Sequence, residues 1–120
     1  MIRELQDYIT SLYSNMTYGQ IPDTPDNLLN LNIYDTGRNP FFGDNSTHIL
    51  TLDLYVRDTS FENMLDNNEL VCNSLLNLYD IDISNIHIVL TKKTSGQQPQ
   101  RDDKNRYSQY SSFEMTVEEV

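Results

Sequence analysis

Hydrophobic residues recur along this chain with two different periods, which separates candidate helices from candidate strands. Near the start they are three or four positions apart and form one stripe: Ile2, Leu5, Ile9, Leu12 and Met16. This spacing predicts an amphipathic helix over residues 2–16. Further along, Thr59-Ser60-Phe61-Glu62 is typical of a capping box. We therefore expect a second helix that starts at Thr59 and runs to about Tyr79.

Strict alternation of apolar and polar residues marks the strands. It is clearest from His48 to Arg57, where the apolar members fall on one face: Leu50, Leu52, Leu54 and Val56. Weaker alternation predicts three more strands, at residues 28–35, 86–91 and 107–117. The resulting order, α-β-β-α-β-β, indicates an α+β fold with a mostly antiparallel four-stranded sheet and two helices on one face. We expect residues 1–120 to form a single domain.

Two segments rich in turn residues fall outside these patterns, and we interpret them as long arms. The first arm, from Arg38 to Thr47, carries Phe41 and Phe42, which a purely solvated loop has no reason to keep. The second arm, from Lys92 to Arg106, is polar and contains basic residues in an otherwise acidic chain: Arg101, Lys104 and Arg106. Apolar anchors and unpaired charges favour contacts with other subunits. The predicted interface residues are Arg38, Phe41, Phe42, Arg101, Lys104 and Arg106.

The charge balance excludes several classes of partner. The formal net charge is −10, from 18 acidic and 8 basic residues. Affinity for nucleic acid comes largely from Lys and Arg, so we expect no stable binding of nucleic acid. Anionic membranes are disfavoured for the same reason, and no apolar run is long enough to span a bilayer. The first residues lack a secretory signal pattern, which favours synthesis in the cytoplasm.

Residue types that carry chemistry are present, but not in the spacings that chemistry needs. His48 and His87 lie in strand patterns without the neighbouring ligands of a metal site, and we interpret the single cysteine, Cys72, as a buried apolar residue. We expect no catalytic site, metal or cofactor. Five tyrosines fall mostly outside the apolar stripes and could be scattered surface residues or part of a protein interface: Tyr8, Tyr13, Tyr18, Tyr34 and Tyr55.

Two short segments carry a family resemblance. The first is Ile21-Pro22-Asp23-Thr24-Pro25-Asp26-Asn27, followed by a strand that ends at Thr36-Gly37, and the second is Gln97-Gln98-Pro99-Gln100-Arg101-Asp102-Asp103-Lys104-Asn105-Arg106-Tyr107. The proline-containing segment after an N-terminal helix and the polar, Arg-containing loop before the last strand resemble the phage minor capsid and tail-terminator family. A second glycine often follows the Thr-Gly turn there; this chain has Arg38.

The resemblance implies a structural virion protein at the junction of tail and neck, made in the host cytoplasm. Such a protein forms a homo-oligomeric ring, a hexamer in the family, that caps the tail tube and joins it to the neck and head-completion proteins, while DNA passes through the bore. Two other interpretations stay open. One is another head-tail connector, such as a head-closure or adaptor protein, and the other is a small acidic enzyme or ligand-binding domain.

Exchanging Phe41 and Phe42 for Ser should abolish assembly and leave the fold intact, because a loop anchor contributes to an interface and not to the core. Thermal unfolding of the variant should stay cooperative, and native mass spectrometry should show monomer only. A variant that fails to fold would place the two phenylalanines in the core instead.

Overall fold

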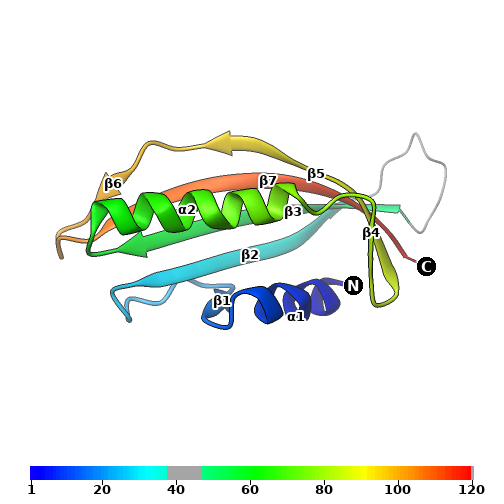
Figure 1. The fold of residues 1–120 in the computed structure, drawn as a ribbon, viewed down its shortest axis with the longest axis horizontal. Helices are drawn as coiled ribbons and strands as arrows, with labels where there is room; N and C mark the ends of the chain where they lie inside the picture. Colours follow the sequence, from blue (N-terminus) through cyan, green and yellow to red (C-terminus); the bar gives the residue numbers. More distant parts are fainter. Residues whose placement is uncertain (38–46, 120) are drawn as a thin grey trace.

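The computed structural model describes residues 1–37 and 47–119, and it has two helices packed on one face of a curled sheet (Figure 1). Helix α1 spans Ile2–Leu12 and helix α2 spans Phe61–Leu76. The molecule is elongated, with principal extents of 48 × 25 × 23 Å. Neither α1 nor α2 is long and apolar enough to cross a membrane. The predicted α+β class and the two helices are therefore confirmed.

The described residues form seven strands, not the four that the sequence predicts. Their order across the sheet is β1-β2-β3-β7-β5-β4, with β6 beside β7. Their bounds are β1 Met16–Tyr18, β2 Leu28–Gly37, β3 Thr47–Asp58, β4 Ile81–Ile83, β5 Ile86–Gly96, β6 Gln100–Arg101 and β7 Tyr107–Glu119. The β1 and β2 strands are parallel, and the other pairs of described strands are antiparallel. The missed strands, β1, β4 and β6, have only two or three residues, too few for alternation to show.

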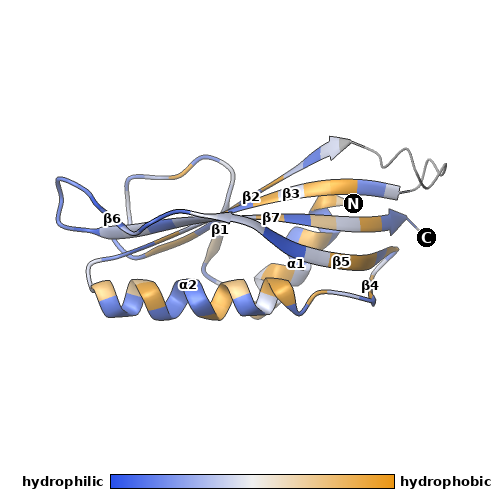
Figure 2. Ribbon diagram, turned by 90° about the horizontal axis from the view of Figure 1, so that it is seen from above, coloured by the Kyte–Doolittle hydropathy of each residue, from blue (hydrophilic) through white to orange (hydrophobic). Residues whose placement is uncertain are grey.

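The core lies between the helices and one face of the sheet (Figure 2). Register places Leu31 of β2 beside Leu54 of β3, and Leu52 of β3 beside Phe113 of β7, so apolar side chains from three strands line the same face. Leu5 and Ile9 of α1 belong to the same buried cluster. Both helices thus cover one face, as predicted, and the polar positions of the strands form an opposite, open face.

Both helices are shorter than predicted. Helix α1 ends at Leu12 because Tyr13 is already extended, with φ −133°, and Met16 is buried from strand β1 instead. Helix α2 is capped by Ser60, whose hydroxyl accepts a hydrogen bond from the Asn63 amide at 3.3 Å. The prediction that Thr59 caps this helix is therefore wrong by one position, because Ser60 is the capping residue.

The predicted second arm is largely a strand. Residues 92–96 continue β5 and pair with β7, and β6 adds a short pair with the start of β7. The sequence gives no alternation of apolar and polar residues over 92–96, because both faces of the strand are exposed there and carry polar residues. Only the connections on either side of β6, residues 97–99 and 102–106, remain as loop. The predicted first arm, apart from Thr47 at the start of β3, lies outside the described residues.

Candidate functional site

The described residues that flank the first predicted arm and the loops of the second arm lie at opposite ends of the elongated sheet. Register places Leu28 beside Arg57 and Arg57 beside Ser108, which brings the start of β2, the end of β3 and the start of β7 together. We call this the β6 end. The other end, called the β4 end, holds Gly37 and Thr47, which flank the first arm. Arg38, Phe41 and Phe42 lie outside the described residues, whereas Arg101, Lys104 and Arg106 lie at the β6 end.

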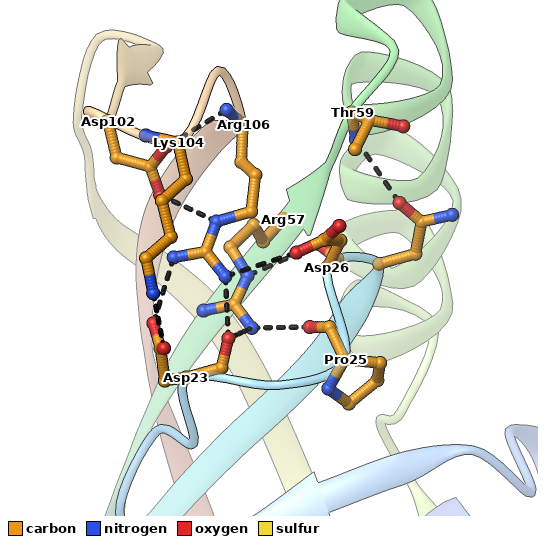
Figure 3. Close-up of polar contacts among 9 residues, drawn as sticks. Asp23, Pro25, Asp26, Arg57, Thr59, Asp102, Lys104 and Arg106 are labelled. Carbon is orange, nitrogen blue, oxygen red and sulfur yellow. Dashed lines mark hydrogen bonds and ion pairs between the residues drawn. The ribbon is translucent and has the colours of Figure 1, made fainter.

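Arg57 fastens the proline-containing loop, residues 19–27, to the open face of the sheet (Figure 3). Its guanidinium donates to three main-chain carbonyls, those of Asp26 at 3.2 Å, Asp23 at 3.2 Å and Pro25 at 2.5 Å. The arginine is only 3% exposed. An irregular loop has few backbone partners of its own, so a buried arginine that satisfies three carbonyls fixes its path.

Arg106 joins the same loop to the turn that precedes β7. Its Nε donates to Asp102 Oδ2 at 2.7 Å, and its Nη1 and Nη2 donate to the carbonyl and carboxylate of Asp23 at 2.6 and 3.2 Å. Asp26 completes an ion pair at 3.5 Å. Arg106 is 6% exposed, so the side chain predicted to reach a neighbouring subunit is held inside its own chain.

The other two predicted basic residues of this end remain at the surface. Lys104 forms an ion pair with Asp23, and both side chains are more than half exposed. Arg101 lies over the ring of Tyr107 and donates to Asn105 Oδ1 at 2.5 Å. The interface role predicted for these residues stays a prediction, and exposure makes it feasible for Arg101 and Lys104.

The ion pairs of the β6 end lower the pKa values of two carboxyl groups. The pKa of Asp23 is lowered by its hydrogen bonds to Lys104 and then to Arg106. The pKa of Asp102 is lowered first by the amide of Arg106, at 2.9 Å, and also by its guanidinium. Both lowered pKa values favour the ionised carboxylates that hold Arg106. We call the contacts of Arg57 and Arg106 with residues 19–27 and Asp102 the clamp.

The β4 end has histidines between carboxylates instead. His87 Nδ1 lies 2.7 Å from Asp82 Oδ1, and Nε2 lies 3.4 Å from Asp80 Oδ1; the hydrogen bond to Asp82 is the main cause of a raised His87 pKa. His48 lies 2.9 Å from Asp35 and 3.5 Å from Glu119. The carboxylates contact different nitrogens of each ring, so they do not converge as metal ligands do.

Tyrosines on the open face are tied into contacts within the chain. Tyr34, 39% exposed, donates to Asp53 Oδ2 at 2.7 Å, and Ser112 donates to the other oxygen of that carboxylate at 2.7 Å. Tyr55 is buried and packs against Tyr110 with ring centroids 4.8 Å apart. The remaining three of the five tyrosines that the sequence places outside the apolar stripes are half-buried against the core: Tyr8, Tyr13 and Tyr18.

The described residues carry no group of three or more His, Cys, Asp or Glu side chains that could hold a metal ion. An open hollow lies along α2, lined by Asp66, Glu69, Leu70 and Asn73. Cys72 is buried, as predicted, and burial raises its pKa. The surface of the described residues offers ion pairs, hydrogen-bonding groups and exposed aromatic rings.

Sequence reasoning missed Arg57 and the carboxylates that Arg106 contacts. A signal for Arg57 was available, because a long cationic side chain ends the polar face of the clearest strand. No pattern in the sequence indicated the partners of Arg106, since Asp23 lies 83 residues away from it along the chain.

Comparisons with known proteins bear on the fold. No family model matches this chain, and no curated protein matches its sequence. Among solved structures, it is similar to a chain from the virion of a native gene transfer agent (GTA) particle, with a TM-score of 0.60 and 16% identity. The match covers 98% of this chain and 90% of that one. The two chains share the fold over nearly their whole length.

Replacing Arg57 with Met should destabilise the protein by about 1–3 kcal/mol, because three loop carbonyls lose a charged donor. Arg101→Met is the matched control, and removing its exposed guanidinium should cost less than about 0.5 kcal/mol. Urea unfolding measures both, and hydrogen exchange at residues 19–27 should accelerate only in the Arg57 variant. Equal losses in the two variants would contradict the clamp.

Stability should fall at both extremes of a moderate pH range. Asp23 and Asp102 have lowered pKa values, so their contribution is complete above the ordinary value of 3.8 and is lost as the pH falls below it. His87 has a raised pKa, so its contribution is complete below 6.5 and is lost as the pH rises through the raised value. Urea midpoints measured from pH 3 to 9 should show Asp23→Asn flattening the acid decline and His87→Gln flattening the alkaline one. A wild-type midpoint that is constant over this range would refute both assignments.

Proposed function

We propose that this chain is a structural virion protein of a tailed phage or phage-like particle. The observation that carries the proposal is the fold shared, nearly end to end, with a chain of a gene transfer agent virion. The motifs around Asp23 and Arg106 support it independently, because they resemble a virion protein family and coincide with the clamp that fixes the β6 end.

Within the virion, we propose the role of tail terminator, a hexameric ring that caps the tail tube and joins it to the neck. A ring subunit in that place needs two distinct contact surfaces, one for the tube and one for the neck. The chain offers an elongated body whose two ends differ in chemistry, with exposed Arg101 and Lys104 at one end and histidine–carboxylate pairs at the other. The proposed partners are further copies, the tube protein and the neck or head-completion protein.

Charge supports a passage for DNA in preference to a binding site for it. Six copies of a chain with net charge −10 carry roughly −60, and such a ring repels phosphates. We propose no catalytic activity and no cofactor. A head-closure or adaptor protein is the alternative that fits the same observations, because it too joins rings in the neck. A small acidic ligand-binding domain is less favoured, since the hollow on α2 is open and lined by residues of that helix alone.

The purified protein, alone or mixed with tail-tube subunits, should assemble into a closed ring. Six copies of a 14.0 kDa chain give roughly 84 kDa, which native mass spectrometry resolves from other stoichiometries. Electron-microscopy class averages should show a ring that sits on the end of a tube. A tube of uncontrolled length when the gene is deleted distinguishes a terminator from an adaptor, whose loss leaves finished tails unjoined. Protein that is monomeric in both samples would refute the ring.

A further inference from the structure

Among the strands of residues 1–37 and 47–119, part of β2 and part of β5 have a hydrogen-bonded neighbour on one side only. The β1 strand pairs with β2 no further than Leu31, so β2 from Asn32 to Gly37 pairs with β3 alone. The β4 strand pairs with β5 no further than Ile88, so β5 from Leu90 to Gly96 pairs with β7 alone. Within residues 1–37 and 47–119, no main-chain group bonds to the outer side of either stretch. We call them the β2 edge and the β5 edge.

The two edges lie at the same height along the strands. The row of side chains that starts at Tyr34 passes through Thr51 and Glu114 and ends at Lys92. The next row on the same face repeats this relation from edge to edge: Asn32, Asp53, Ser112 and Ser95. Each edge is therefore the continuation of the other across the sheet, on opposite sides of the molecule (Figure 1).

Strand direction makes the two edges compatible. The β2 strand is antiparallel to β3, β3 to β7, and β7 to β5, so β5 runs opposite to β2. Copies related by rotation about an axis along the strands would meet edge to edge as an antiparallel pair. Because the edges are level, rotation alone joins them. A closed ring needs this condition, whereas a shift with each copy produces an open helix.

Charge favours this pairing over a pairing of like edges. Lys92 and Lys93 lie on the β5 edge, and neither makes an ion pair with a described carboxylate. Lysines on an edge oppose its pairing with a second copy of itself. The β2 edge carries one charged residue, the acidic Asp35, which lies on the helix face in the row next to that of Ile33 and also contacts His48. On the open face, Tyr34 of this edge donates a hydrogen bond to Asp53 of β3.

We propose that the β5 edge of one copy pairs, antiparallel, with the β2 edge of the next copy, so that the sheets join around the ring. Lys92 then lies beside Tyr34 of the neighbour, and Lys93 lies diagonal to its Asp35. The pairing also covers Leu90, which is 51% exposed in the single chain. This inference rests on the proposed ring and specifies its subunit interface.

Disulfide cross-linking tests the pairing. In a Cys72→Ser background, the double variant Tyr34→Cys with Lys92→Cys should, on mild oxidation, give a ladder of covalent oligomers in denaturing gels. Each single variant should give none, because a head-to-tail interface keeps identical positions apart. The control double variant, Tyr34→Cys with Lys104→Cys, uses an exposed lysine at the β6 end and should give at least tenfold less cross-linked product. Hydrogen exchange on the unmodified protein gives a second readout: amides of residues 90–96 should slow at least tenfold on assembly.

The outcomes separate this inference from the function on which it rests. A ring by native mass spectrometry that neither cross-links at Tyr34 and Lys92 nor protects residues 90–96 overturns the edge pairing and leaves the ring. Cross-linking of Lys92→Cys alone overturns it in favour of pairing between two β5 edges. Protein that remains monomeric with tube subunits overturns both the pairing and the ring.

Discussion

The ladder between β3 and β7 sets the position of everything else in this protein. The β3 strand pairs with β7 along its whole length and with β2 from Ile49 to Arg57. Its core-facing residues Leu50, Leu52, Leu54 and Val56 are completely buried, and burial of each contributes about 1.5–3 kcal/mol. A slip of one residue would turn all four to the open face, so the register is strongly specified. The same alternation directs Arg57 to the open face, where it reaches the proline-containing loop.

The parts of the fold that the sequence predicts are those where alternation or helical spacing continues for many residues. The β3 strand and the part of β7 from Ser111 to Val117 show both faces clearly. The β5 strand shows them only to Thr91, because Lys92 to Gly96 are exposed on both faces and no longer alternate. The β1 strand is hidden for a different reason: Met16 continues the helical stripe of α1 and is buried, but from a strand. Periodicity indicates which residues face the core and does not always indicate the backbone that carries them there.

The candidate site was predictable in composition but not in its partners. The sequence identifies basic residues in the segment before β7 and a rigid segment before β2, and the structure brings these two segments together. It does not reveal that Arg106 contacts Asp23, because that contact depends on how β2, β3 and β7 align. Charge type is a local property of the chain, whereas burial of a charge depends on the whole sheet. This is why Arg106 is a clamp within the chain while Lys104, two residues earlier, stays at the surface.

Met1 and the last described residue, Glu119, lie at the β4 end, so the described part of the β6 end is built from internal connections (Figure 1). Each of these connections joins two strands, or a strand and a helix. The longest of them, residues 19–27, is held by Arg57 and Arg106. A partner that docks on the β6 end meets a surface that is already ordered, and binding loses little conformational entropy there. Affinity at the β6 end can therefore come from a small contact area.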